Sequence, residues 1–440
     1  MIMKNNNAMK MDNISKQIDA VTKKISVSDN SLDVNKAGKA LKKYYEKKYE
    51  DFQSDEFEFD FIDLFCGAGG LSTGLERAGF RPVVAIDKDK SALATYQFNR
   101  PWLDENDVIN EDIRTITDTY TFPHVPLVVG GPPCQGFSVV NKQKKENDER
   151  NELYKFYVHA VEQSKPEIFL MENVDGILKV YDAIKSDFDR VGYLTCKPLL
   201  LSPKDFGFPQ SRRRAFILGI KKEYESLQED LFSLFQSSIE KQKTQKKYTL
   251  WDAIGDLPEI TAKTQKNSTW IESEAWGYTI SKTMNRLTEY SALINGGNLR
   301  ELPVLNHRSK YNNERDIKIY GLLQQGEKSD AESIDEINPY KNRSDIFKDK
   351  FDKLVADEPC KAITAHMYYD CNMYIHPNQA RGLSPREAAR VQGFPDDYFF
   401  IGSPNEWYRQ VGNAVSPLMA TVLGDALNKV LKRIVTDGNN

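Results

Sequence analysis

The 440-residue sequence predicts an α/β fold in which helices cover both faces of a doubly wound, mostly parallel sheet. Short apolar runs typical of buried strands alternate with segments of helical spacing between residues 59 and 220. Glycine or acidic residues follow several of these runs, at the strand ends where such sheets bind ligands. The alternation stops after residue 220, which indicates a smaller second domain inserted into the first.

Residues 1–57 precede the alternating region and differ from it in composition. They are polar and rich in Lys, Asn and Asp, and no glycine occurs before Gly38. The stretch "SLDVNKAGKALKKYYEKKYED" (31–51) has helical character but few apolar positions. We interpret 1–57 as an N-terminal helical or partly disordered extension. A solvated extension is favoured, and a small DNA-binding or regulatory element remains open.

Residues 58–220 form the first predicted domain. "FDFIDLF" (59–65) suits a buried strand, and glycines separate it from the helical segment "LSTGLERAGF" (71–80). Further strands are expected at "RPVVAID" (81–87), "VIN" (108–110), "VPLVVGG" (125–131), "EIFLMENV" (167–174) and "RRAFILGI" (213–220), with helices at "KSALATYQFN" (90–99) and "YKFYVHAVEQS" (154–164).

The remaining chain divides at about residue 358. Residues 221–357 are polar and rich in Lys and Asn, and we assign them to the inserted domain. Residues 358–440 are expected to complete the first domain. In "SPREAARVQGF" (384–394), Ser384 is a predicted helix N-cap with Pro385 at the first helical position. "SPLMATVLGDALNKVLKRIV" (416–435) predicts a long amphipathic helix.

The composition narrows the class of protein. A net charge of -4 does not indicate a nucleic-acid-binding protein, although a global sum can hide a basic cleft. The five cysteines form no C-x-x-C pair, which argues against a disulfide framework or a zinc cluster and favours a reducing compartment. No apolar run approaches the roughly 18 residues of a membrane span, and the N-terminus lacks the apolar core of a signal peptide. We therefore expect a cytoplasmic protein without a metal site or membrane contact.

Three successive strand ends carry the residue types of a nucleoside pocket. A glycine loop follows Phe65, and its spacing is neither G-x-G-x-x-G nor a phosphate-binding loop. Asp87 ends the next strand, where an acid accepts hydrogen bonds from ribose hydroxyls, and Asp112 is placed to accept from an adenine amino group. Adenosine joined to an amino acid, as in S-adenosylmethionine, suits this pattern better than NAD. Taken alone, the glycine loop could also be a tight structural turn.

The next two strand ends bring a cysteine and a glutamate together. Cys134 lies in "GGPPCQGFS" (130–138), and Glu172 lies in "LMENV" (170–174). A free cysteine is more often an inert core residue, which is our interpretation of Cys196, Cys360 and Cys371, and a lone glutamate could cap a helix. Side by side near a cofactor loop, Cys134 and Glu172 indicate a nucleophile and an acid.

Six ordered motifs resemble those of the DNA (cytosine-5) methyltransferases, of the bacterial type II modification kind. They are "DLFCGAGGLSTGLERAGF", "GGPPCQGFS", "MENV", "QSRRRAFILGI", "RGLSPREAARVQGFPDDYFF" and "QVGNAVSPLMATVLGDAL", and they cover most of 59–220 and 358–428. The resemblance implies a Rossmann-like S-adenosylmethionine-dependent methyltransferase domain with a smaller inserted target-recognition domain at 221–357. S-adenosylmethionine is then a co-substrate and no metal is needed.

The resemblance also implies residue roles. Cys134 would attack C6 of a flipped-out cytosine, Glu172 would protonate N3, Arg214 would hold Glu172 or the base, and Arg212 would contact the backbone near the target. Around the cofactor, Gly67 and Gly69 shape the loop, Phe65 stacks near the adenine, and Leu153 and Asn413 complete the pocket beside Asp87 and Asp112. Asn173 is expected to pin the Pro132-Pro133 turn, and Gln135 and Ser138 to lie in a loop that closes over DNA.

The expected partner is double-stranded DNA, with a companion restriction endonuclease that the chain need not contact and a monomeric state. Basic residues that could meet DNA in 221–357 are Arg300, His307, Arg308, Lys310, Arg315 and Arg343. A tRNA cytosine-5 methyltransferase and a catalytically silent DNA-binding regulator remain alternatives. The length of the recognition region argues against the first, and the intact pair of Cys134 and Glu172 argues against the second.

Overall fold

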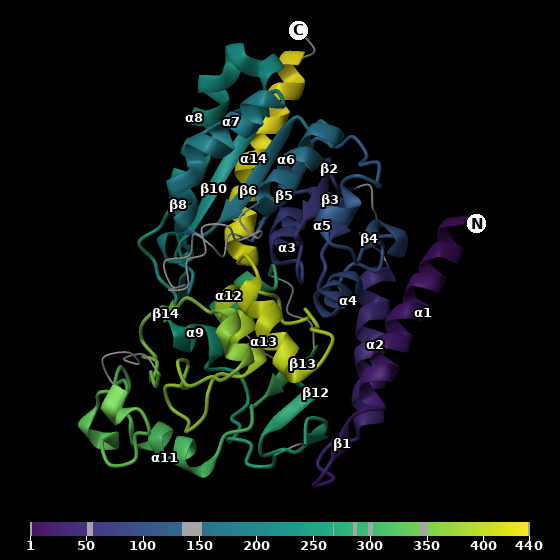
Figure 1. The fold of residues 1–440 in the computed structure, drawn as a ribbon. Coiled ribbons are helices and arrows are strands. Elements are labelled where there is room, and N and C mark those ends of the chain that lie inside the picture. Colours follow the sequence, from purple (N-terminus) through teal and green to yellow (C-terminus); the bar gives the residue numbers. More distant parts are fainter. Residues whose placement is uncertain are drawn as a thin grey trace.

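The computed structural model describes residues 2–50, 56–133, 152–266, 268–284, 288–297, 302–343 and 350–438. Two lobes lie one above the other, with the N-terminal helices along one side (Figure 1). We call the upper one the sheet lobe and the lower one the second lobe. None of the described helices combines the length and the apolar character that a bilayer-spanning segment requires.

The sheet lobe is built on one sheet, to which eight strands of the described chain contribute, in the order β4-β3-β2-β5-β6-β10-β7 with β8 beside β10. Strands β4 to β6 along this order are parallel, and β10 runs antiparallel to β6, β7 and β8. This confirms the doubly wound α/β prediction. The strands are β2 (Phe59–Leu64), β3 (Phe80–Ile86), β4 (Val108–Ile109), β5 (Leu127–Gly130), β6 (Ile168–Asn173), β7 (Tyr193–Thr195), β8 (Leu199–Leu201) and β10 (Arg214–Lys221).

Helices cover both faces because neighbouring strand residues point to opposite sides. Phe61 packs against the layer of α3 (Gly70–Arg77), α8 (Gln228–Glu240) and α14 (Pro417–Gly438). Ile62 packs against the layer of α5 (Ile113–Ile116), α6 (Leu153–Ser164) and α7 (Tyr181–Arg190). The backbones of α3 and α14 approach closely, since a Cβ on Gly74 would lie 2.3 Å from the carbonyl oxygen of Pro417.

The packing moves one boundary that we expected from the sequence. Helix α8 falls in 221–357, yet its Leu231 and Phe235 are buried in the same core cluster as the sheet and α14. The second lobe therefore starts after Glu240, because α8 buries its apolar face against the sheet lobe.

The second lobe combines the inserted region with most of the C-terminal part. It holds α9 (Leu250–Ile254), β11 (Ile271–Glu272), β12 (Gly277–Met284), α10 (Glu289–Ile294), β13 (Leu302–Arg308), α11 (Glu314–Leu322), α12 (Pro385–Gln392) and α13 (Pro404–Asn413). Helices α12 and α13 share a core with α9 and α10, so only α14 from 358–440 covers the sheet. Ser384 caps α12 with Pro385 in its first turn, as predicted. Short strands β9 (Gln210–Ser211) and β14 (Cys360–Lys361) pair across the two lobes.

The N-terminal extension is a packed helical hairpin. Helices α1 (Ile2–Thr22) and α2 (Val34–Glu50) pack together, and β1 (Ser26–Val27) between them pairs with β11. The core that they enter includes Phe98 at the end of α4 (Lys90–Phe98) and Leu305 of β13. The favoured interpretation of a solvated extension is wrong for these helices, because α2 buries apolar side chains against the second lobe and α1 buries its own against α2.

Candidate active site

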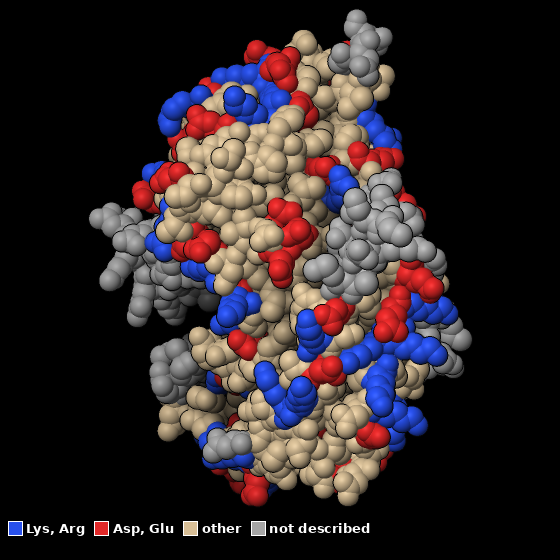
Figure 2. Space-filling model, turned by 90° about the vertical axis from the view of Figure 1, so that its right-hand side faces the viewer, with Lys and Arg blue, Asp and Glu red and all other residues tan. Residues whose placement is uncertain are grey.

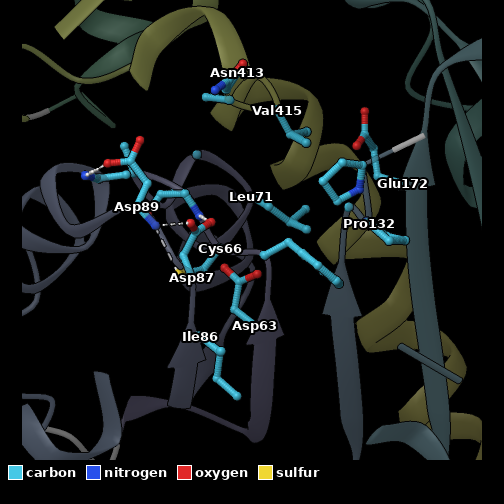
Figure 3. Close-up of a pocket in the computed structure, with 18 of the residues that line it drawn as sticks. Asp63, Cys66, Leu71, Ile86, Asp87, Asp89, Pro132, Glu172, Asn413 and Val415 are labelled. Atoms are coloured by element: carbon cyan, nitrogen blue, oxygen red, sulfur yellow. Dashed lines mark hydrogen bonds between the residues drawn. The ribbon is translucent and has the colours of Figure 1, made fainter. Parts of the chain in front are cut away.

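A cavity of about 420 Å³ opens at the carboxyl ends of β2, β3, β5 and β6, next to the junction of α13 and α14. In Figure 3, Asp87 and Asp89 lie on one side of it, Glu172 and Pro132 on the other, and Asn413 and Val415 close the top. The predicted site residues that line it are Phe65, Gly67, Asp87, Asp112, Leu153, Glu172, Arg212, Arg214 and Asn413. Some of these residues were expected from the strand-end argument and others only from the family resemblance, and all of them line one cavity.

The glycine loop between β2 and α3 forms the floor of the cavity. Its turn needs left-handed backbone at Phe65 (φ 59°), Gly67 (φ 54°) and Gly69 (φ 82°). Gly67 lines the cavity, and its N–H donates to Oδ2 of Asp87 over 2.8 Å. Gly69 lies on the side of the loop that faces away from the cavity, next to Arg100 and Tyr398.

Asp87 and Asp112 differ in what they offer a ligand. Asp87 also accepts from the N–H of Asp89 (2.8 Å), and burial raises the pKa of its carboxyl. Asp112 caps α5 and forms an ion pair with Arg114 at 2.8 Å, and that hydrogen-bonded partner lowers its pKa. Asp112 therefore lines the cavity as a carboxylate that already has a partner.

Glu172, near the end of β6, lies against the backbone of Gly131, which follows β5. Its Oε1 lies 3.1 Å from Nε of Arg214, and a Cβ on Gly131 would come within 2.6 Å of Oε2. Burial raises the pKa of Glu172, and the two nearby arginines, Arg214 and Arg212, oppose that effect only in part. A protonated Glu172 is therefore more accessible than for a glutamate in water, as a general acid requires.

Arg212 has an unused donor. Its Nη1 donates to the carbonyl of Ile363, but its buried Nε has no hydrogen-bond partner among the described residues. Burial, followed by repulsion from Arg214, lowers the pKa of Arg212 to about 9. A buried polar atom without a partner is costly, so Arg212 Nε is a natural contact for a group that enters the cavity.

The predicted nucleophile and its loop, Cys134, Gln135 and Ser138, lie outside the described residues. The chain is described up to Pro133, which lines the cavity. Nδ2 of Asn173 donates to the carbonyl of Pro132 over 2.8 Å, which confirms the expected support of the Pro132-Pro133 turn.

The basic residues that were predicted to meet DNA differ in how deeply they are buried. His307 is buried between Ser384 and the carbonyl of Pro258, and Arg308 is buried in an ion pair with Glu272. Both serve the core and are unsuitable for reading DNA. Lys310 donates to the carbonyl of Tyr368, Arg315 is half-exposed beside Asp316, Arg300 lies outside the described residues, and so does the side chain of Arg343.

Two residues escaped the sequence analysis, one on the cavity wall and one on the exposed surface. Asp63 lines the cavity, and burial raises its pKa to about 7 while Ser72 donates to it over 2.5 Å. Tyr369, 72% exposed, follows the short helical turn Ala365–Tyr368. The acid of "FIDLF" was a visible signal for Asp63, but nothing in the sequence marks Tyr369 as exposed.

The charged side chains on the cavity wall fit a ligand in which adenosine is joined to an amino acid. The acidic side chains on the wall are Asp63, Asp87, Asp89, Glu111, Asp112 and Glu172, against the basic Lys88, Arg212 and Arg214. Carboxylates accept from ribose hydroxyls and attract a cation, whereas a diphosphate would need an excess of cations or free helix N–H groups. Within the described residues, no group of three or more His, Cys, Asp or Glu side chains is arranged to hold a metal ion.

Comparisons with known proteins show which family the chain is similar to. The family model for C-5 cytosine-specific DNA methylases matches residues 59–429. The type II methyltransferase M.DdeI of Desulfomicrobium norvegicum is 31% identical over 86% of this chain and 91% of its own length. M.AgeI of Thalassovita gelatinovora is also 31% identical, over 83% of this chain and 98% of its own length. A crystal structure titled as a prophage-encoded DNA modification methyltransferase (E. coli) superposes with a TM-score of 0.63 at 27% identity, covering 85% of this chain and 100% of that one.

Proposed function

The chain belongs to the C-5 cytosine-specific DNA methylase family, and we propose that it methylates a flipped-out cytosine in a specific DNA sequence through a covalent Cys134–C6 bond. The observation that carries the proposal is the group of Glu172, Arg214 and Arg212 on the wall of the cavity. It combines a buried acid, the cation that orients it and a buried donor without a partner.

The residues divide the chemistry of C5 activation. The thiolate of Cys134 adds to C6, and the electron pair of the C5–C6 double bond shifts toward N3, which takes a proton from Glu172. Arg214 keeps the Glu172 side chain pointed at the base. When C5 takes the methyl group, the electron pair of the C4–C5 enamine bond forms the new bond, and N3 returns its proton to Glu172. Loss of the C5 hydrogen as a proton then restores the C5–C6 double bond and expels the thiolate from C6.

The cofactor-side residues hold the methyl donor. S-adenosylmethionine, when bound, supplies an electrophilic methyl group on a sulfonium. Asp87 accepts from the ribose hydroxyls, Asp112 from the adenine amino group, and Phe65 and Leu153 give the apolar contacts. Asn413 supports the methionine end, Gly67 lets the loop approach the ligand, and Gly69 supplies the left-handed backbone that the turn needs.

A base within a duplex cannot reach the cavity, so the proposal requires that the cytosine leave the stack, at a cost of a few kcal/mol. Double-stranded DNA would lie between the lobes, with the second lobe recognising the sequence. We propose that exposed Tyr369 and the Nε of Arg212, which has no partner among the described residues, contact the DNA on that path. We further propose that the chain is the modification half of a restriction–modification system and acts as a monomer.

Trapping with 5-fluorocytosine DNA tests the covalent step. Fluorine cannot leave C5 as a cation, so the Cys134–C6 bond should persist after methyl transfer and shift the protein on a denaturing gel. Cys134→Ser should abolish the adduct. Cys66→Ala, which changes another cysteine on the cavity wall, should retain it. Absence of adduct and turnover with the unaltered chain would favour a silent DNA binder.

A second experiment tests the substrate. Duplex DNA should accept labelled methyl groups and total tRNA should not, and labelling of tRNA alone would overturn the DNA assignment. Bisulfite sequencing of DNA from a host that expresses the chain should then show one protected cytosine within a fixed sequence.

A further inference from the structure

Three side chains of helix α2, in the N-terminal hairpin, contact Asp397 of the second lobe. The hydroxyl of Tyr45 donates to the carbonyl of Asp397 over 2.6 Å, and that of Tyr44 to its Oδ2 over 2.9 Å. Nζ of Lys48 forms an ion pair with the same Oδ2 at 2.8 Å. Burial disfavours the charge on Asp397, but Lys48 keeps its pKa below the usual value. Asp397 is thus anchored as a carboxylate.

The next residue, Tyr398, reaches the cofactor loop. Its hydroxyl donates to the carbonyl of Ala68 and accepts from Nη1 of Arg100 over 3.0 Å. Nη2 of Arg100 in turn donates to the carbonyl of Gly69 over 3.1 Å. The rear of the loop is therefore fixed by the residue that directly follows the anchor of α2.

The same hairpin also contacts the sheet lobe beside the loop. Tyr45 packs edge-on against Phe98, with ring centroids 5.1 Å apart, and Phe98 packs on Phe399 at 5.3 Å. The hydroxyl of Tyr49 donates to the carbonyl of Asn99 over 3.2 Å, and Nδ2 of Asn99 to that of Phe399 over 3.0 Å. Helix α2 thus contacts both lobes next to the place where Tyr398 of the second lobe meets the cofactor loop of the sheet lobe.

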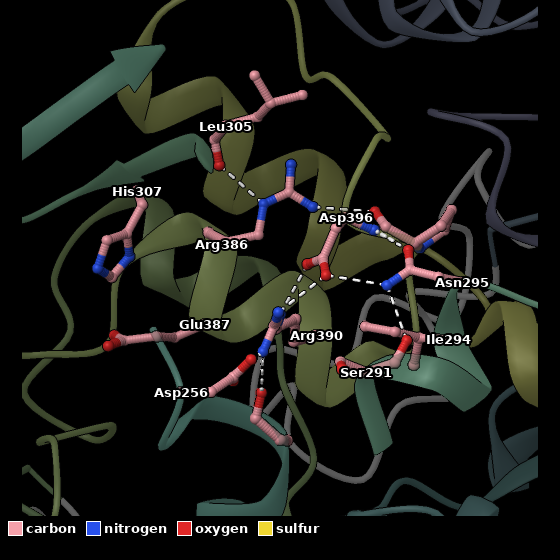
Figure 4. Close-up of polar contacts among 12 residues, drawn as sticks. Asp256, Ser291, Ile294, Asn295, Leu305, His307, Arg386, Glu387, Arg390 and Asp396 are labelled. Atoms are coloured by element: carbon pink, nitrogen blue, oxygen red, sulfur yellow. Dashed lines mark hydrogen bonds and ion pairs between the residues drawn. The ribbon is translucent and has the colours of Figure 1, made fainter. Parts of the chain in front are cut away.

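Other supports of this segment come from within the second lobe. Arg390 lies between Asp256 and Asp396, and Asn295 also donates to Asp396 (Figure 4). Arg386 donates to the carbonyl of Tyr398 over 2.6 Å. These contacts hold the segment from one side and α2 holds it from the other, so removal of the α2 contacts should loosen it without unfolding it.

We propose that Tyr45 and Lys48 are positioning residues for the cofactor loop, through which the N-terminal hairpin raises the affinity for S-adenosylmethionine. The inference rests on the proposed function for the identity of the ligand. The hairpin precedes the region matched by the family model, which begins at residue 59, so this support belongs to the extension of the present chain.

The test uses substitutions on the two faces of α2 in the full-length protein. Figure 2 looks onto the side that carries the hairpin and shows Lys and Arg gathered over its lower half. Lys43 is exposed on α2 and serves as the matched control for the half-buried Lys48. The variants are Lys48→Met, Tyr45→Phe, the conservative Lys48→Arg, and Lys43→Met.

Two measurements separate positioning from stability. Calorimetric titration with S-adenosylmethionine should show about three- to tenfold weaker binding for Lys48→Met and Tyr45→Phe, since each loses one hydrogen bond. Lys48→Arg and Lys43→Met should bind within twofold of the unaltered chain. Hydrogen exchange without ligand should accelerate at the amides of 66–70 in Lys48→Met, with exchange in β6 unchanged.

A lower melting temperature with unchanged affinity and unchanged loop exchange would overturn the inference, because the contacts would then serve stability alone. Equal effects of Lys43→Met and Lys48→Met would also overturn it, because Lys48 pairs with Asp397 and exposed Lys43 serves as the control without that contact. If the unaltered chain fails to bind S-adenosylmethionine, the proposed function fails, and the affinity claim fails with it. Loop exchange would still report separately whether α2 positions the loop.

Discussion

Replacing Gly69 with alanine should destabilise the protein, whereas the same change at Gly67, two residues earlier, should mainly impair ligand binding. Both glycines have positive φ, 82° and 54°, so each alanine meets a left-handed backbone strain of about 1–2 kcal/mol. The difference lies in what the new methyl group meets.

At Gly69 the added Cβ would lie 2.5 Å from Nη1 of Arg100, 2.8 Å from the ring of Tyr96 and 2.9 Å from the hydroxyl of Tyr398. Such overpacking costs about 1–3 kcal/mol, so the total loss of stability should be about 2–5 kcal/mol. At Gly67 no described atom lies within 4 Å, because the Cβ would project into the cavity. Gly67→Ala should therefore lose about 1–2 kcal/mol of stability and bind S-adenosylmethionine about tenfold more weakly.

Urea unfolding and calorimetric titration of both variants measure the two quantities. The reasoning is refuted if both variants lose the same stability, or if Gly67→Ala binds the ligand as tightly as the unaltered chain. Either result would mean that the wall of the cavity is not where the described loop puts it.

Three other outcomes follow from the site. Glu172→Gln should lower the single-turnover methylation rate by about 10²–10⁴, with little change in the affinity for S-adenosylmethionine. In the unaltered chain, this rate should fall as the pH rises through the raised pKa of Glu172, because the side chain then loses its proton. The contribution of Asp63 to the free energy of unfolding should decrease as the pH rises from 3.8 to about 7, because folded Asp63 retains a proton that the unfolded chain has lost. Asp63→Asn should flatten this slope in urea titrations at pH 5 and pH 8. Tyr369→Ala should raise the KM for DNA about three- to tenfold and leave S-adenosylmethionine binding unchanged, whereas equal loss of both would contradict its placement on the DNA path.

The sheet and its ligand-bearing ends could be predicted from the sequence because both depend on local patterns. An apolar run followed by a glycine loop or an acid marks a strand end, and parallel strands end on one edge of the sheet. Asp87 and Glu172 therefore came together as expected. The support of Pro132 by Asn173 was predictable from the resemblance to known methyltransferases.

The burial of basic and aromatic residues could not be predicted. Arg308 and His307 resemble DNA contacts in the sequence, but in the fold they fill a core with partners up to 77 positions away. Tyr369 resembles a core residue and is exposed. Polarity sets the cost of burial, while the presence of a compensating partner depends on the whole packing arrangement.

The sequence by itself determined the main strands and helices of 59–220, the helices that begin at Pro385 and Pro417, the family and the residue types at each strand end, since these follow from periodicity, turn chemistry and ordered motifs. The tertiary structure alone decided that α8 covers the sheet, that α12 and α13 join the second lobe, and that the N-terminal hairpin reaches the cofactor loop through Asp397 and Tyr398. The hydroxyl of Tyr45 and the carbonyl of Asp397 are 352 residues apart in sequence. Contacts across such separations are selected by the burial of apolar surface in the complete molecule, and no local pattern records them.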